Sequence, residues 1–439
     1  MLDLSLRPHP LVSQFESLLA VLNADLPAEL ATFRRDALNR FSLVGLPTRS
    51  DEEFRYLSAR TFEDFPSAPA YGATISREQI ESTITGGIDS VVVVFVNGEA
   101  APELSSYETL PEGVIVGTLR AALAEGTATG FGTIATLEGK LGSTNDERLV
   151  DLNSAYFADG GFIFVPRGLA LERAIQIIHV TQADHGTFLV APRNLIVLED
   201  GAEAKIIESY VGLGGTYASI PVTEVKVGER AHLDWVRVQQ ESETAIHLST
   251  TAVFQAEASV VRSTVVNFGG LVVRNELNAD VRGERTETWL NGVNVGQGEQ
   301  LIDNHTRLDH AVPNCQSFEV YKSVLDDRST GVFNGKIFVS EDAQKTDAKQ
   351  TNQAILLSGQ ATYNTKPQLE IFADDVKCTH GATVGTLRED ALFYLRSRGI
   401  PEKQARALLI YAFAADVLEG VSLPEVRSAL EAALFAKLV

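Results

Sequence analysis

The stretch from 227 to 266, V-G-E-R-A-H-L-D-W-V-R-V-Q-Q-E-S-E-T-A-I-H-L-S-T-T-A-V-F-Q-A-E-A-S-V-V-R-S-T-V-V, decides the fold. It consists of short β-rich runs separated by small-residue turns. Related turns begin at Gly201, Gly228, Ala256 and Gly283, at steps of 27, 28 and 27 residues. A constant period of about 20 to 50 residues that carries only strands and turns is typical of a solenoid. We therefore expect a mainly β protein whose core is a parallel β-helix, with each coil stacked on the next.

The solenoid pattern extends from about 146 to 384, and it predicts that core as one domain. A β-sandwich fits less well, because its turns recur every ~8–12 residues without a longer register. The period weakens after Gly283, so we expect the last coils to be lengthened or distorted. Stacked polar ladders are expected at positions such as Gln344, Asn352, Gln353 and Asn364.

Residues 1–145 predict a helical and α+β region before the core. Leu11, Phe15 and Leu18 begin a series at helical spacing, and Val91–Val96 is a short apolar run that predicts a buried strand. A helix is expected near Thr118–Leu123.

Residues 385–439 predict a helical domain that follows the solenoid. A first helix ends near Gly399, Pro401 opens a second helix, and a third helix runs from about Pro424 to Lys437. The predicted domains are therefore 1–145, 146–384 and 385–439.

The composition excludes several classes of function. With 37 Lys and Arg against 58 Asp and Glu, the formal net charge is −21, which argues against binding to nucleic acid or to an anionic membrane. No apolar run approaches the ~20 residues of a membrane span, and no secretory signal is recognisable. Two cysteines are too few for a disulfide framework, so we expect a cytoplasmic protein.

The segment D-D-V-K-C-T-H-G-A-T, residues 374–383, holds the strongest candidate site. On a strand, Cys378 and His380 point to the same face with α-carbons ~6.5 Å apart, and a thiolate and an imidazole suit iron or zinc. Two ligands do not close a tetrahedral site. We therefore expect a half-site completed by another subunit, with no metal held tightly by the isolated chain; the alternative is an inert, buried thiol.

Other candidate residues have simpler explanations. Cys315 is explained by a core position, and hydrogen-bonded structural roles are the commoner outcome for His305 and His310, although the two could face one cavity. The sequence has no P-loop, no G-x-S-x-G and no H-E-x-x-H motif. G-V-F-N-G-K-I-F at 331–338 is interpreted as a turn that feeds a strand. These features favour a scaffold rather than an enzyme.

Several motifs resemble the SufB/SufD family of iron–sulfur cluster assembly proteins. They are D-H-A-V-P-N-C, G-V-F-N-G-K-I-F-V, A-Q-K-T-D-A-K-Q-T-N, T-K-P-Q-L-E-I-F-A-D-D-V-K-C-T-H-G-A-T-V-G and A-L-F-Y-L-R-S-R-G-I, spread almost continuously over about 305–412. The chain resembles the SufD subunit more than the SufB subunit. It has H-G-A-T at 380–383 where the B type carries H-E-A-T, and it lacks the extra cysteines of that type.

The resemblance implies a right-handed parallel β-helix whose C-terminal end pairs with a SufB-like paralogue. It also implies that the C-terminal helices bind a SufC-like ABC-type ATPase, through a face that we place at Leu392, Tyr394, Arg396 and Arg398. A transient cluster then forms at the B–D interface, with His380 as the ligand of this chain and Cys378 beside it. Some complexes of the family are associated with reduced flavin, but no residue here locates such a site.

Three alternatives stay open at this point. In the first, the chain is a purely structural partner, or a homodimer through an uncovered solenoid end. In the second it is a self-contained metalloprotein, and in the third it is a carbohydrate-active β-helix. The last would need a catalytic groove and normally an export signal. Metal analysis of the isolated chain separates the self-contained site from the half-site.

Overall fold

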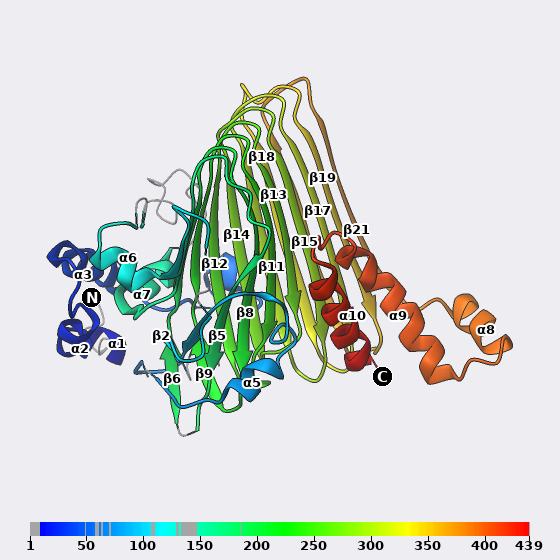
Figure 1. Ribbon diagram of the computed structural model, residues 1–439. Coiled ribbons are helices and arrows are strands. Elements are labelled where there is room, and N and C mark those ends of the chain that lie inside the picture. Colours follow the sequence, from blue (N-terminus) through cyan, green and yellow to red (C-terminus); the bar gives the residue numbers. More distant parts are fainter. Residues whose placement is uncertain are drawn as a thin grey trace, which may run out of the picture.

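The computed structural model describes residues 9–48, 50–57, 61–62, 65–69, 72–106, 110–128, 131–132, 147–184 and 186–438. Figure 1 shows a long stack of strands with one group of helices beside its first coils and a second group beside its last coils. The described helices are α1 (Pro10–Ser13), α2 (Phe15–Leu22), α3 (Ala28–Val44), the 3-10 turn η1 (Glu52–Phe54), α5 (Arg77–Glu81), α6 (Leu119–Ala124), α7 (Arg148–Tyr156), α8 (Glu389–Ser397), α9 (Glu402–Leu418) and α10 (Pro424–Leu438).

The described strands form two sheets, and the chain passes from one sheet to the other as it winds. The strands are β1 (Ser90–Val96), β2 (Glu99–Ala100), β3 (Ile115–Thr118), β4 (Gly161–Val165), β5 (Ala174–Thr181), β6 (Thr187–Val190), β7 (Arg193–Leu198), β8 (Glu203–Gly212), β9 (Thr216–Ser219), β10 (Val222–Val227), β11 (His232–Gln240), β12 (Ile246–Gln255), β13 (Val260–Asn267), β14 (Val272–Val281), β15 (Glu287–Gly296), β16 (Leu301–His310), β17 (Gln316–Leu325), β18 (Thr330–Val339), β19 (Asp347–Leu356), β20 (Thr362–Ile371) and β21 (Lys377–Thr386).

The sheet order confirms the predicted parallel solenoid. One sheet runs β2-β1-β5-β8-β11-β13-β15-β17-β19-β21, and the other runs β20-β18-β16-β14-β12-β10-β7-β4-β3, with β6 and β9 beside it. From β5 onward, successive coils pair in parallel within each sheet. Strand β1 of the predicted N-terminal region also joins the first sheet through β5. The predicted boundary at 145/146 lies outside the described residues.

The repeated turns have a common backbone conformation. Arg230, Ala258 and Arg285 adopt left-handed φ values of 56°, 56° and 60° at equivalent corners of successive coils. The Arg230 N–H donates to the Glu257 carbonyl at 2.8 Å, and the Ala258 N–H donates to the Glu284 carbonyl at 2.7 Å. Each corner is thus hydrogen-bonded to the next, which explains the regular period of the sequence.

The period lengthens toward the end of the solenoid, as predicted. In the first sheet the register advances by 27 residues from Ser263 to Leu290, but by 31 residues from Glu319 to Gln350.

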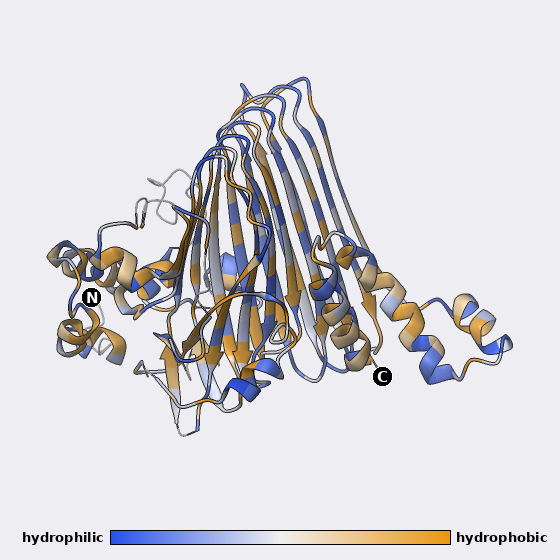
Figure 2. Cartoon of the chain, in the orientation of Figure 1, coloured by the Kyte–Doolittle hydropathy of each residue, from blue (hydrophilic) through white to orange (hydrophobic). Residues whose placement is uncertain are grey.

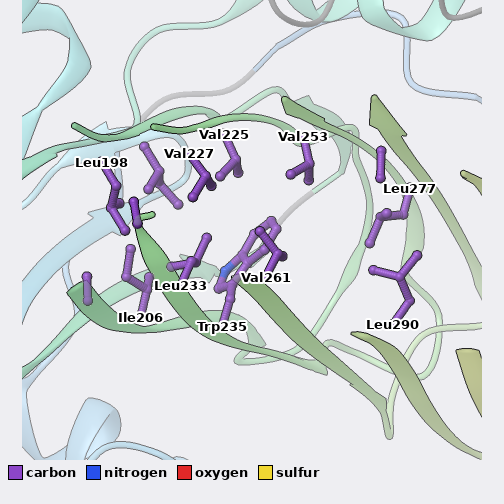
Figure 3. Packing of buried hydrophobic residues seen from close by; sticks show 14 of the residues in the cluster. Leu198, Ile206, Val225, Val227, Leu233, Trp235, Val253, Val261, Leu277 and Leu290 are labelled. Atoms are coloured by element: carbon purple, nitrogen blue, oxygen red, sulfur yellow. The ribbon is translucent and has the colours of Figure 1, made fainter. Parts of the chain in front are cut away.

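Alternate residues of each strand point into the solenoid and form its core. Figure 3 shows side chains from both sheets meeting between them, with Trp235 among the largest and only 1% exposed. The burial of each such aliphatic side chain stabilises the fold by about 1.5–3 kcal/mol. Cys315 lies in the same cluster, fully buried, so the prediction of a core thiol is confirmed.

Polar ladders also run inside the solenoid, but mostly at other positions than predicted. The Asn267 amide donates to Asn294 at 2.7 Å, and the Asn294 amide donates to Ser323 at 3.0 Å. Of the four predicted residues, Asn352 faces the interior and is fully buried. Gln353 and Asn364 were assigned wrongly, because the alternation of the strands could not be phased from the sequence, and they lie on outward-facing positions. Gln344 lies in a turn, where its amide donates to the Glu341 carbonyl at 2.8 Å and its side-chain oxygen accepts from the Asp375 N–H of the next coil at 2.9 Å.

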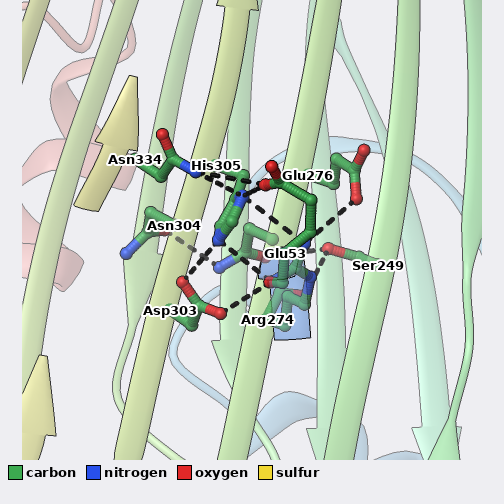
Figure 4. A network of polar contacts seen from close by, with 9 residues as sticks. Glu53, Ser249, Arg274, Glu276, Asp303, Asn304, His305 and Asn334 are labelled. Atoms are coloured by element: carbon green, nitrogen blue, oxygen red, sulfur yellow. Dashed lines mark hydrogen bonds and ion pairs between the residues drawn. The ribbon is translucent and has the colours of Figure 1, made fainter. Parts of the chain in front are cut away.

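A polar network attaches the N-terminal region to the outer face of the second sheet. Arg274 donates to Asp303 at 2.8 Å and to the Glu53 carbonyl at 2.8 Å, and Asp303 also pairs with His305 at 2.9 Å (Figure 4). Burial and Arg274 act against the charged imidazole, but the carboxylates of Asp303 and Glu53 outweigh them and raise the pKa of His305.

His305 and His310 lie on opposite faces of β16, so the idea that the two share one cavity is wrong. They are an odd number of residues apart, and strand side chains alternate. The His310 ring lies 2.9 Å from the Ser317 hydroxyl inside the solenoid, and burial lowers its pKa to about 4. Both histidines have the hydrogen-bonded structural role that the sequence favoured.

The C-terminal helices α9 and α10 cover the outer face of the first sheet. Ile410, Ala414 and Leu430 pack on Val293 and Val324 in one buried cluster. Lys322 extends from the sheet and binds the Asp416 carboxylate at 2.6 Å. In Figure 2 these helices are largely hydrophobic, whereas the strands alternate in hydropathy.

Candidate functional site: the open end of the solenoid

The solenoid ends in two strands that each have a neighbour on one side only. Strand β21 pairs with β19, strand β20 pairs with β18, and both are terminal in their sheets. Such an edge presents unpaired backbone N–H and C=O groups, which another chain can use for pairing.

Cys378 and His380 lie on this last strand and on its inward-facing side. Cys378 is the register partner of Ala348, and His380 is the register partner of Gln350. Ala348 and Gln350 are 0% and 1% exposed and face the core. Cys378 is half-buried and packs against the core cluster, whereas His380 is exposed because no coil follows it. The predicted common face of the two side chains is thus confirmed.

The Cys378 thiol has an environment that keeps it protonated. Burial raises its pKa, the backbone N–H of Ala348 acts in the opposite direction, and the Asp347 carboxylate raises the pKa further. Because the thiolate is the form that binds metal, binding at this position requires release of a proton.

The remaining residues of the rim come from the terminal strands β20 and β21, from the turn between them, and from Asn352 on β19. The Tyr363 hydroxyl donates to Asn352, and the Asn352 amide donates to Thr365 at 2.7 Å. Burial raises the pKa of Tyr363 to about 12, so the phenol stays protonated. Phe372 and Val384 are 61% and 44% exposed, which gives the open end apolar surface for a partner.

The acidic residues near this segment do not complete a metal site. Glu370 pairs with Lys336 at 3.0 Å on the outer face, and Asp375 pairs with Lys345 in a turn. Across the described residues, no group of three or more His, Cys, Asp and Glu side chains is placed to hold a metal ion. The arrangement at the open end therefore offers two ligands, those of Cys378 and His380.

A buried polar pair lies directly behind this site, and the sequence analysis missed it. Glu319 and Gln350 are register partners on inward-facing positions, each 1% exposed, and the Gln350 amide donates to the Glu319 carboxylate. Burial raises the pKa of Glu319 to about 7. The signal was present in the sequence as charged or amide residues at alternate strand positions, but the phase of that alternation had to be known.

The predicted ATPase-binding face is only partly at the surface of α8. Tyr394 is 58% exposed, the Arg396 guanidinium pairs with Glu402 at 3.2 Å, and Arg398 lies 5.3 Å from the Tyr394 ring centre. Leu392 is only 4% exposed, because it belongs to the apolar stripe of the helix. Phe393 is 72% exposed and was not singled out from the sequence, although it falls outside that stripe. In Figure 1, α8 lies beyond β21 and away from the sheets.

Comparison with known proteins identifies the family of this chain. The family described as SUF system FeS cluster assembly, SufBD core domain, matches residues 179–413, and the SufBD protein N-terminal region matches residues 9–177. An iron–sulfur cluster assembly SufBD family protein of Synechocystis sp. is 30% identical over 417 residues, which cover 91% of this chain and 89% of the relative.

Two relatives carry a more specific name. The iron–sulfur cluster assembly protein SufD of Escherichia coli is 31% identical over 390 residues, covering 88% of this chain and 87% of the relative. SufD of Bacillus subtilis is 28% identical over 295 residues, covering 65% of this chain and 66% of the relative. The chain belongs to the SufBD family and has a role in iron–sulfur cluster assembly, which confirms the resemblance drawn from its motifs.

No helix among the described residues is both long enough and apolar enough to cross a membrane.

Proposed function

We propose that this chain is the SufD-like subunit of a cluster assembly scaffold and that it pairs with a SufB-like paralogue through the open end of its solenoid. The iron–sulfur cluster is the transient cargo of the interface between them. The chain itself is not an enzyme in this proposal, and it has no resident cofactor. Reduced flavin, where present, belongs to the assembled complex.

The position of His380 carries the proposal. In every earlier coil, the inward-facing positions of this sheet are covered by the next strand, but β21 has no following strand. His380 is therefore exposed at a position where a polar side chain would otherwise be enclosed. A partner that adds its own strand edge to β21 would enclose the imidazole and supply the missing ligands.

His380 acts in this proposal as a neutral imidazole ligand to iron, and Cys378 acts as an auxiliary thiol beside it. Imidazole and thiolate together suit iron and zinc. A half-site of this kind also explains why the ligands sit at an edge that can pair, rather than in a closed pocket.

The test uses co-expression of the chain with its SufB-like and SufC-like partners. The complex is purified through a tag on this chain, and iron and sulfide are measured under anaerobic conditions for wild type, His380→Ala and Thr379→Ala. Thr379 is the matched control, since it is exposed on the outward face of the same strand. We expect all three complexes to assemble and only His380→Ala to lack the cluster.

Equal loading of the His380→Ala complex would refute the ligand role. The chain would then be a structural partner, which is the alternative function. Cys378→Ala is measured in the same series, and a partial loss of cluster is the result expected for an auxiliary thiol.

We further propose that α8 binds the SufC-like ATPase. The exposed aromatic side chains of Phe393 and Tyr394, together with Arg396 and Arg398, support this role, because exposed aromatic and arginine residues are typical of protein interfaces.

We propose that the protein acts in the cytoplasm. The chain has two cysteines, and the structure leaves both of them free, as in proteins kept in a reducing compartment.

A further inference from the structure

Three inward-facing residues form one row that ends at the proposed cluster site. Glu319 on β17 pairs in register with Gln350 on β19, and Gln350 pairs in register with His380 on β21. The first two are each 1% exposed, and His380 is exposed. His380, the last residue of the row, therefore follows two buried polar residues, Gln350 and Glu319.

The Glu319 carboxylate orients the Gln350 amide. The Gln350 amide donates an N–H to Oε2 of Glu319, which can accept in either protonation state, and the carbonyl oxygen of the amide is thereby directed elsewhere. The carbonyl oxygen Oε1 of Gln350 is buried, and it has no hydrogen-bond partner within the described part of the chain. A buried acceptor without a partner is unfavourable, so a donor within reach at the open end would be bound there.

A glycine in the opposite sheet makes room for this amide. A Cβ atom added to Gly335 on β18 would lie 2.3 Å from Gln350 Nε2 and 2.7 Å from the Phe333 ring. Any other residue at 335 would thus displace the Gln350 side chain. This glycine belongs to the G-V-F-N-G-K-I-F segment at 331–338, whose interpretation as a turn that feeds a strand was wrong, because the whole segment lies within β18.

We propose that Gln350, oriented by Glu319, is the positioning residue for His380. Neighbouring strands are about 4.8 Å apart, so a ring N–H of His380 is within reach of Gln350 Oε1. That hydrogen bond satisfies the unpartnered oxygen and selects one tautomer of the imidazole. The other ring nitrogen then keeps its lone pair for iron, which is the arrangement that metal-binding histidines generally have.

This inference rests on the proposed function for its meaning, but its first test does not need a cluster. The isolated chain is labelled with ¹⁵N-histidine, and long-range ¹H–¹⁵N spectra report the tautomer of each ring, with His380→Ala used to assign the signal. We expect one dominant tautomer for His380 in the wild type. Gln350→Met removes the acceptor while keeping the side-chain length, and it should give a mixture of both tautomers.

Two further variants separate positioning from a general structural effect. Asn352→Leu changes an equally buried amide on the same strand, one inward position along, and should leave the His380 tautomer unchanged. The exchange variant Glu319→Gln/Gln350→Glu keeps one amide and one carboxylate in the pair and again places an acceptor beside His380. It should restore the single tautomer, which a loss of packing would not allow.

The second test measures cluster loading of the complete complex. Second-sphere partners of metal-binding histidines typically contribute about 10–100-fold to affinity, so Gln350→Met should reduce loading at limiting iron by about 10-fold. An unchanged tautomer in Gln350→Met overturns the inference. If His380→Ala loads normally, the proposed function fails, and the tautomer result on the isolated chain still decides the Gln350–His380 contact.

Discussion

Replacement of Glu319 by Gln should stabilise the protein, and more strongly at alkaline than at acidic pH. Burial raises the pKa of Glu319 from an ordinary value of 4.5 to about 7. The folded protein therefore binds this proton more tightly than the unfolded chain does. The contribution of Glu319 to the free energy of unfolding is fully present below pH 4.5 and is lost as the pH rises through 7.

The size of the effect follows from the shift. A shift of one pKa unit corresponds to about 1.36 kcal/mol, so the full penalty of ionising Glu319 in the folded state is about 3 kcal/mol. Of this penalty, about 2 kcal/mol develops between pH 5.5 and pH 8.5. The Gln side chain has nearly the shape of the protonated acid, and because it does not ionise, it carries no such penalty. The free energy of unfolding of Glu319→Gln should thus exceed that of the wild type by about 2 kcal/mol more at pH 8.5 than at pH 5.5.

Urea unfolding followed by tryptophan fluorescence is a suitable assay. Trp289 stacks on Phe318, the neighbour of Glu319, at 4.3 Å, and pH 5.5 stays above the isoelectric point of about 4.8. Burial lowers the pKa values of His179 and His310 to about 3 and about 4, but their contributions cancel in the comparison of the two proteins. A stability difference that is the same at both pH values would refute the reasoning.

Three other predictions concern separate parts of the chain. Ala258→Gly should stabilise the protein by about 1 kcal/mol in thermal unfolding, because it relieves the left-handed conformation at φ 56°, while Ala256→Gly in the same turn should destabilise it. Asp303→Asn should cost about 1.5–3 kcal/mol near neutral pH, because it removes the carboxylate that accepts from the buried Arg274 guanidinium at 2.8 Å and leaves the longer ion pair with Glu276 at 3.5 Å. Burial opposes the ionised form of Asp303, but His305 and Arg274 outweigh it and lower its pKa, so this loss should shrink as the pH falls through the lowered pKa. Phe393→Asp, or Arg396→Glu together with Arg398→Glu, should reduce co-purification of the SufC-like ATPase; unchanged recovery would exclude α8 from that interface.

The solenoid could be predicted because its physical cause repeats in the sequence. Each coil needs a corner in the left-handed region, and short, small-residue segments recur at these corners, so the period was visible without any structure. The helix after Pro401 was predicted for an equally local reason, the proline at its start. Local signals of this kind do not depend on which residues meet in space.

The site could be predicted only as far as one strand reaches. The common face of Cys378 and His380 follows from alternation within β21, whereas the position of Gln350 behind His380 depends on the register between β19 and β21. Coil lengths vary in the last turns, so this register could not be obtained from the period. Leu392 was placed on the binding face although it belongs to the apolar stripe of α8, and the structure buries it. That stripe already argued against a surface role.

At the end of a repeat array, a position that is structural in every earlier coil can become a binding site. Inside the solenoid, polar residues such as Asn267 and Asn294 are enclosed and hydrogen-bonded, and their role is to fit the core. At the last coil, the same inward-facing position is exposed and supported from below by a rigid stack of strands. A side chain placed there combines access with fixed orientation, which a surface loop does not provide. Enclosure by a partner would then lower the local dielectric and strengthen each polar contact of His380, so the site would be complete only when the two subunits are joined.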